Sequence, residues 1–107
     1  MARIELNEAD NGSTRTARVG DELVIDLDEI PSSGHRWAPV STPEVVEGPT
    51  EDDFAPVEGG GIGAGGRRTL AFRVREPGEG RLTLVRRQEW DPEHPSGRFE
   101  VTVRVPD

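Results

Sequence analysis

The chain has no cysteine, lysine or tyrosine, and it has no long apolar run. Without cysteine it can form no disulfide, no thiolate nucleophile and no thiolate metal site. The N-terminal residues are polar and lack the apolar stretch of a signal peptide, and no segment approaches the roughly 20 apolar residues of a membrane span. We therefore expect a cytoplasmic protein, unless an export segment has been removed.

The acidic residues outnumber the basic ones, 21 to 13, so the formal net charge is −8. Such a surface repels nucleic-acid phosphates and anionic lipids, and we expect neither nucleic acid nor a membrane as a partner. A length of 107 residues suits a single domain over residues 1–107. We expect it to be a monomer when free.

Apolar residues alternate with polar ones along several segments, as in "TLAFRVRE" at 69–76 and "RFEVTVRVP" at 98–106. A period of two indicates antiparallel strands with one face on a core. Turn signals separate these segments, and Gly48–Pro49 divides the region near Val45 from a second short strand around 54–57. No helical stripe is present. The sequence predicts an all-β, immunoglobulin-like, two-sheet antiparallel sandwich of about seven or eight strands.

The most unusual segment is "GGGIGAGGRRT" at residues 59–69. It contains the glycine spacing of a dinucleotide-binding loop, but that motif needs a strand before it and a helix after it. Here a strand pattern follows. A linker between domains is also excluded, because too few residues remain beyond it to complete a sandwich. We expect these glycines to let the backbone approach a partner closely.

Residues with catalytic or metal-binding potential are few and poorly placed for chemistry. Ser32 and Ser33 precede His35, but a serine-rich turn before a strand usually serves turn geometry, and a catalytic triad is defined in space. His35 and His94 are the only histidines and show no metal-ligand spacing. Acidic residues such as Glu29 are interpreted as a solvated rim. We expect no enzyme activity, no metal and no cofactor.

Three segments have no evident structural reason for their composition: "IPSSGHRW" at 30–37, "GAGG" at 63–66 and "RRQEWDPEHPSG" at 86–97. Their order and spacing resemble the chagasin-like inhibitors of papain-type cysteine proteases, which usually carry NPTTG, GxGG and RPW. The positions that take the motif places are Pro31, Ser32, Ser33, Gly34, Gly63, Ala64, Gly65, Gly66, Gln88, Glu89 and Trp90. Ile30 replaces the first motif's asparagine, and Gln88–Glu89 replace Arg-Pro.

The resemblance implies a reversible protein inhibitor that fills the active-site cleft of a papain-like cysteine protease with the loops 30–34, 59–66 and 86–97. The first loop would approach the catalytic residues, where Ser32, Ser33 and Gly34 are small enough to fit. The glycines of the second loop would pair with an extended protease strand, and Trp90 would be an aromatic anchor. The alternative is an immunoglobulin-like binding module whose partner is not a protease.

Overall fold

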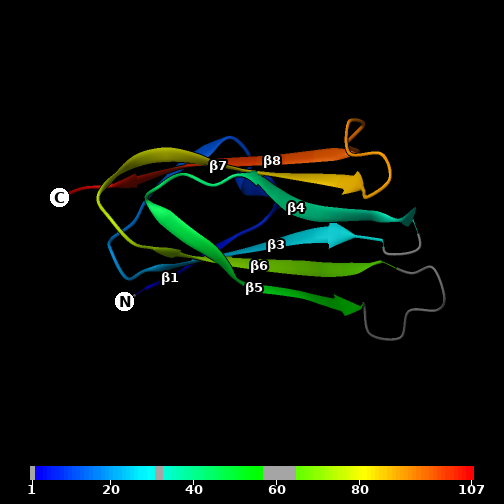
Figure 1. Cartoon of the computed structure of the whole chain (residues 1–107). Coiled ribbons are helices and arrows are strands. Elements are labelled where there is room, and N and C mark those ends of the chain that lie inside the picture. Colours follow the sequence, from blue (N-terminus) through cyan, green and yellow to red (C-terminus); the bar gives the residue numbers. More distant parts are fainter. Residues whose placement is uncertain (1, 31–32, 57–64) are drawn as a thin grey trace.

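The computed structural model of the protein describes residues 2–30, 33–56 and 65–107. These residues form eight strands and one short 3-10 helix (Figure 1). In chain order the elements are β1 (Arg3–Leu6), η1 (Glu8–Asp10), β2 (Ser13–Thr16), β3 (Glu22–Glu29), β4 (His35–Ser41), β5 (Val46–Pro56), β6 (Gly66–Val74), β7 (Gly78–Gln88) and β8 (Gly97–Val105).

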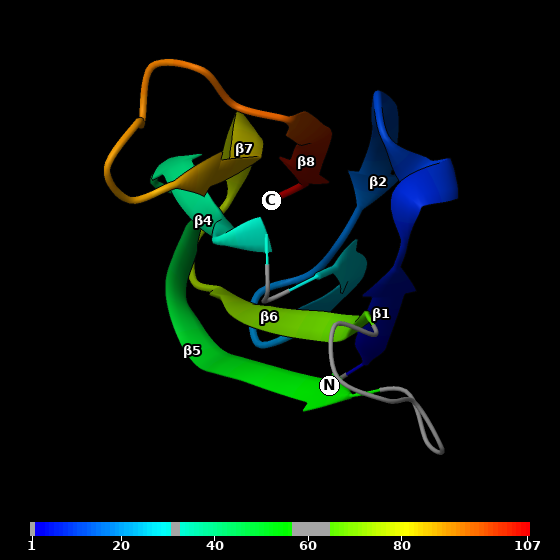
Figure 2. The same cartoon turned by 90° about the vertical axis from the view of Figure 1, so that its right-hand side faces the viewer.

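The strands form two four-stranded sheets that pack face to face, in the orders β1-β3-β6-β5 and β2-β8-β7-β4. Figure 2 shows the two layers in the view along the molecule. The predicted two-sheet, immunoglobulin-like sandwich is confirmed. The central pairs are antiparallel as expected, but the two short N-terminal strands differ, because β1 runs parallel to β3 and β2 runs parallel to β8.

The core lies between the sheets and consists of the inward side chains of the alternating segments. Leu70, Phe72 and Val74 of β6 face Phe99 and the valines of β8 across it, and all of them are buried. Burial of each such side chain stabilises the folded state by roughly 1.5–3 kcal/mol. The period of two therefore located the core correctly.

Strand β5 differs from the two short strands that the turn signal at Gly48–Pro49 predicted. It is one strand, with a shift of register relative to β6 between Glu47 and Glu51. Gly48 has φ +136°, and a Cβ there would lie 2.8 Å from the backbone nitrogen of Thr50. The glycine therefore marks an irregularity within a continuing strand, and only a residue without a side chain fits there.

The helix η1 was not predicted, because it is too short to carry an apolar stripe. It begins at a capping box, in which the Asn7 side chain accepts from Ala9 N and the Asp10 side chain accepts from Asn7 N. At three residues it is far too short to cross a membrane, and the described ranges contain no longer helix.

Asp21 supports the turn before β3, and its charge makes the stability of the fold depend on pH. The backbone N–H groups of Ala2 and Arg18 each donate to one of its carboxylate oxygens at 2.9 Å. These hydrogen bonds hold the pKa of Asp21 below the ordinary aspartate value. A carboxylate with a lowered pKa stabilises the fold above the pKa of the unfolded chain, and this contribution is lost as the pH falls through the folded-state pKa.

We expect Asp21→Asn to be less stable than the wild type at about pH 7 and to differ much less from it at about pH 3. The amide can accept only one of the two hydrogen bonds and turns a donor toward the other N–H group. Urea unfolding at both pH values measures the effect. Asp53→Asn is the control, because Asp53 is exposed and makes no side-chain hydrogen bond within the described ranges. An equal loss at both pH values would contradict the prediction.

Candidate functional site

The three predicted loops lie at one end of the sandwich, which we call the loop end. It is the end at which β3, β5 and β7 finish and β4, β6 and β8 begin (Figure 1). The strand registers require this, since Glu29 pairs with Gly66, and His35 pairs with Gln88. Pro31, Ser32, Gly63 and Ala64 lie outside the described residues.

The base of the loop end is organised by a buried carboxylate. Glu29 ends β3 with only 2 % of its surface exposed, so its interpretation as a solvated rim residue is wrong. Its Oε1 accepts the backbone N–H of Trp37 in the opposite sheet at 2.8 Å, and its Oε2 accepts Nη2 and Nε of Arg68 at 2.7 and 3.0 Å. One side chain thus joins both sheets at the boundary of two loops.

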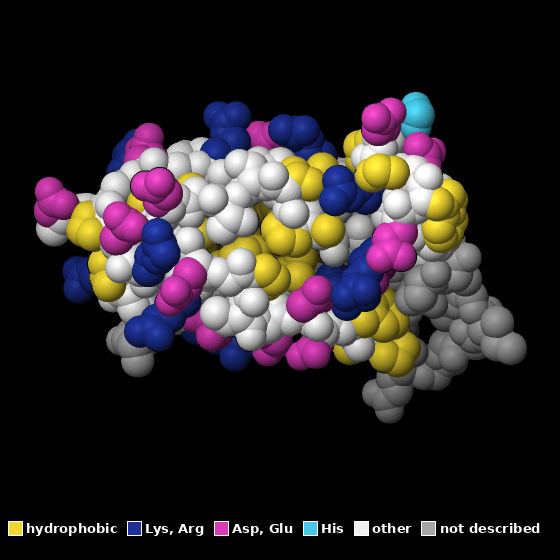
Figure 3. All heavy atoms as spheres, in the orientation of Figure 1, with side chains coloured by type: hydrophobic (Ala, Val, Ile, Leu, Met, Phe, Trp, Pro, Cys, Tyr) yellow, Lys and Arg dark blue, Asp and Glu magenta, His cyan; other side chains and the backbone are white. Residues whose placement is uncertain are grey.

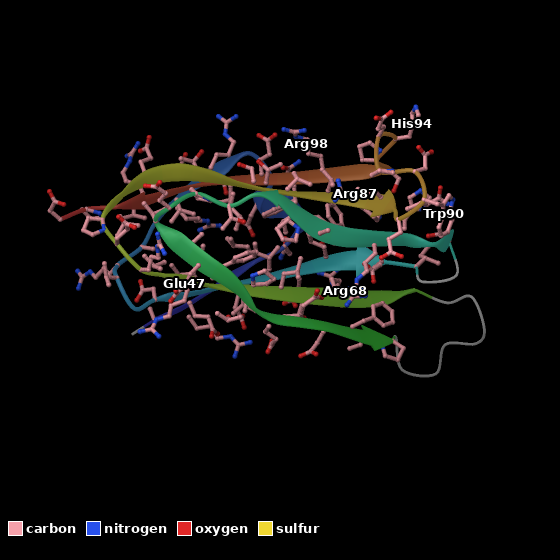
Figure 4. The ribbon with its side chains drawn as sticks, in the orientation of Figure 1. Glu47, Arg68, Arg87, Trp90, His94 and Arg98 are labelled. Carbon is pink, nitrogen blue, oxygen red and sulfur yellow. The ribbon has the colours of Figure 1, made fainter. Side chains whose placement is uncertain are left out.

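Arg68 is the positive partner and is itself held on several sides. Burial alone would lower the pKa of Arg68, but the hydrogen bond and charge of Glu29, followed by the charge of Asp52, raise it. Its Nη1 donates to Asp52 at 3.0 Å, and its guanidinium lies over the Phe54 ring at 5.5 Å. Figure 4 shows Arg68 in the half of the molecule that carries the loop end. The guanidinium therefore stays charged and fixed.

Trp37 anchors the start of β4 against the same base. It is 5 % exposed, and its indole N–H donates to the carbonyl of Asp28 at 2.8 Å. The guanidinium of Arg86 lies over its ring at 5.5 Å. The two ends of the first loop, which follow Glu29 and precede Trp37, are consequently fixed by backbone and side-chain hydrogen bonds.

The described part of the first loop is a closed turn. The Ser33 N–H and hydroxyl both donate to the carbonyl of Ile30, at 3.0 and 2.7 Å, and His35 N donates to Ser33 Oγ at 3.2 Å. Gly34 has φ +78°, a conformation that favours glycine. Ser33 thus supplies the local hydrogen bonds of this loop, and the apolar Ile30 is left 49 % exposed.

The third loop packs directly on the first. A Cβ added to Gly34 would lie 2.4 Å from Cη2 of Trp90, so the indole covers this glycine with no room to spare. Gln88 Nε2 donates to the Ser33 carbonyl at 3.1 Å. Trp90 remains 73 % exposed, and Figure 3 shows hydrophobic surface at the end where Figure 4 labels Trp90. Glu89 is exposed and lines a hollow with Arg36 and Arg87.

The second loop meets the first at Gly65. A Cβ at this position would lie 3.3 Å from both the Glu29 carbonyl and Cγ1 of Ile30. Gly66 is different, because it is buried at the start of β6 and a Cβ there would lie 2.3 Å from the Ala55 carbonyl. Close packing of β5 on β6 accounts for a glycine at 66, so Gly65 is the described glycine of the second loop that faces another loop.

The structure therefore brings together the described parts of all three predicted loops and adds residues that the sequence interpretation missed. The missed residues are Glu29, Arg68 and Arg86. One signal could have found Glu29, because it continues the inward positions of Leu23, Ile25 and Leu27. An acidic residue at an inward position requires a buried partner. No comparable local signal identifies Arg68 as that partner.

A search against protein families matches residues 16–104 to the model described as "Chagasin family peptidase inhibitor I42". The chain belongs to this family. The matched range includes all three loops, and the match confirms the resemblance that the loop motifs indicated. Chagasin-family proteins are inhibitors of cysteine proteases and not enzymes, which favours inhibition over a binding module with another kind of partner.

Individual relatives align with nearly the whole chain. Amoebiasin-1 of Entamoeba histolytica is 30 % identical over 105 residues, covering 95 % of this chain and 99 % of its own length. Chagasin of Trypanosoma cruzi is 28 % identical over 106 residues, with coverages of 94 % and 96 %. The crystal structure of the cysteine protease inhibitor EhICP2 of Entamoeba histolytica matches with a TM-score of 0.84 at 20 % identity, over 97 % of this chain and 96 % of that one.

The described residues contain no group of three or more His, Asp or Glu side chains placed to hold a metal ion. The chemistry available at the loop end is that of recognition: an exposed indole, an exposed aliphatic side chain, and the polar groups of Ser33, His35, Gln88 and Glu89. This composition, an aromatic anchor with polar neighbours, is typical of protein interfaces.

The contact between Gly34 and Trp90 can be tested with a matched pair of glycine variants. Gly34→Ala and Gly12→Ala both force an alanine into positive φ, at a cost of roughly 1–2 kcal/mol. Only Gly34→Ala also displaces Trp90, because nothing lies within 4 Å of a Cβ at Gly12. We expect Gly34→Ala to shift the Trp90 indole N–H resonance and to weaken inhibition of papain by about 10- to 30-fold.

The Gly12→Ala variant should lose comparable stability and keep the inhibition constant of the wild type. Urea unfolding and inhibition assays on both variants give the two quantities. Equal inhibition constants for the two variants would contradict the proposed packing of the first and third loops.

Proposed function

We propose that this protein inhibits papain-like cysteine proteases reversibly, by inserting the loops 30–34, 59–66 and 86–97 together into the active-site cleft. One observation carries the proposal: the described parts of the three loops contact one another at one end, through Gly34–Trp90 and Ile30–Gly65. Loops that are distant in the sequence thus meet at one end of the sandwich, where they can enter a protease cleft together.

The contacts among the described residues at the loop end support tight binding. The base is fixed by the Glu29–Arg68 pair, and Gln88 holds the third loop against the first. Association then loses little conformational entropy at the interface, and preorganised surfaces bind more tightly for that reason. Binding is reversible in this proposal because the loops occupy the cleft through noncovalent contacts and form no bond to the catalytic thiolate.

Each of the three loops is suited to a different kind of contact with the protease. Ser32, Ser33 and Gly34 are small enough to approach the catalytic thiolate and imidazole, and their hydroxyl and N–H groups are suitable hydrogen-bond partners there. Gly63, Ala64 and Gly65 would offer backbone to an extended protease segment, whereas Gly66 is buried against β5 and supports the base of this loop. Trp90 is the largest exposed side chain and the main apolar anchor.

We expect the wild-type protein at micromolar concentration to inhibit papain, with activity recovering on dilution. Trp90→Ala should weaken inhibition by about 30-fold or more, because removal of an interface hot spot costs about 2 kcal/mol or more. Val19→Ala is the control: Val19 is also exposed, at 54 %, but lies at the opposite end, where Gly20 bonds to Val74 at the end of β6. It should leave the inhibition constant unchanged.

The measurement is the steady-state hydrolysis of a fluorogenic peptide by papain across a series of inhibitor concentrations. A folded wild-type protein that does not inhibit would contradict the proposed function. Inhibition that Trp90→Ala leaves unaltered would contradict the assignment of the loop end as the binding surface.

A further inference from the structure

A groove of about 220 Å³ lies between the first and third loops, lined by Ile30, Ser33, His35, Arg86 and Ser96. Among the described lining residues Ile30 is the one apolar side chain, and the polar lining includes the Arg86 guanidinium and the His35 imidazole. The groove lies at the loop end, because Ile30, Ser33 and His35 of the first loop line it on both sides of Gly34 in the chain. A protease bound to the loop end would therefore cover it.

Arg86 is held in a fixed position within this groove by neutral groups. Its Nε donates to Ser96 Oγ at 3.0 Å, its Nη2 to the Ser96 carbonyl at 3.2 Å, and its Nη1 to the Asp28 carbonyl at 3.5 Å. The stack on Trp37 restrains the plane of the guanidinium. A guanidinium has five N–H groups, so these three bonds leave two for a ligand.

The charge of Arg86 has no carboxylate partner within the described ranges. Among the described residues, ten of the 13 arginines form ion pairs with aspartate or glutamate, and three form none there: Arg18, Arg86 and Arg87. In a protein of net charge −8, a cation left with neutral acceptors at the functional end is unusual. An external carboxylate can form a charge-assisted hydrogen bond with this guanidinium without displacing a carboxylate of the described residues.

His35 lies on the same groove and adds a second polar group. Its Nδ1 is 3.2 Å from Ser33 Oγ, which leaves Nε2 as the ring nitrogen available to a ligand. We propose that this groove accepts a carboxylate side chain, an aspartate or glutamate on the rim of the bound protease, with Arg86 as its charge partner and His35 beside it. The proposal rests on the proposed function, since it assigns part of the same interface.

The groove can be tested first without any protease, with sodium acetate as the probe. Acetate replaces sodium chloride at constant ionic strength while the arginine Nε–H and backbone N–H resonances are followed by NMR. We expect saturating shifts of the Arg86 Nε–H and His35 N–H resonances and no saturating shift of Arg18. Arg86→Gln should abolish the shift at His35. If Arg86 and His35 respond no more than Arg18, the proposal is overturned.

The second arm uses the papain-like protease that the wild type inhibits most tightly in a small panel. We expect Arg86→Gln to weaken inhibition by about tenfold or more, since a charge-assisted hydrogen bond contributes about 1.5–3 kcal/mol. Arg86→Lys keeps the positive charge but lacks the planar set of N–H donors of a guanidinium, so it should weaken inhibition less than Arg86→Gln does. Arg18→Gln is the matched control, because Arg18 also lacks a carboxylate partner within the described ranges but lies near Asp21, away from the loop end.

Acetate competition separates a role in binding from a role in shaping the loop. Exchanging chloride for acetate should weaken inhibition by the wild type and leave inhibition by Arg86→Gln unchanged, which a merely structural role would not produce. Equal inhibition by Arg86→Gln and Arg18→Gln would overturn the proposal. Acetate binding at Arg86 without inhibition of any protease would instead refute the proposed function and, with it, the assignment of the carboxylate to a protease.

Discussion

The functional end of the molecule depends on one buried ion pair, Glu29–Arg68, whose carboxylate also binds the opposite sheet. Glu29 accepts from Trp37 in the opposite sheet and from Arg68 in its own. Removing one member of such a pair leaves the other charge uncompensated, at a cost of about 3–5 kcal/mol. Because Glu29 immediately precedes the first loop, Trp37 follows it and Arg68 follows the second loop, this interaction sets the distance between the two loops.

The remaining contacts at the loop end extend this arrangement outward. Trp90 covers Gly34, and Gln88 bonds to Ser33, so the third loop takes its position from the first. Two of the exposed large hydrophobic side chains, Ile30 and Trp90, are thereby placed together at one end. A fixed base with an apolar and hydrogen-bonding surface above it is what a noncovalent inhibitor requires, since preorganisation reduces the entropy lost on binding.

The sequence predicted the sandwich and the grouping of the loops, but it did not predict the structural roles of Glu29 and Gly66. Alternation identifies the inward positions of β3 and β8 because side chains point to opposite faces in turn. The same alternation places Glu29 inward, but its charge suggested a solvated position, and its partner comes from a strand distant in the chain. Gly66 was grouped with the loop glycines, and its close contact with Ala55 depends on a pairing of β5 with β6 that no local pattern indicates.

Hydrogen exchange at the loop amides of Glu29→Gln tests the central claim most directly, with Asp52→Asn as the control that removes the outer partner of the same guanidinium. If the buried pair positions the loops, Glu29→Gln accelerates exchange at Ser33, His35 and Trp37, whose amides donate hydrogen bonds in and beside the first loop, while the amides of β7 and β8 stay protected. Asp52→Asn changes these rates little. Unchanged exchange at Ser33, His35 and Trp37, or a uniform rise throughout the sandwich in Glu29→Gln, would contradict the account.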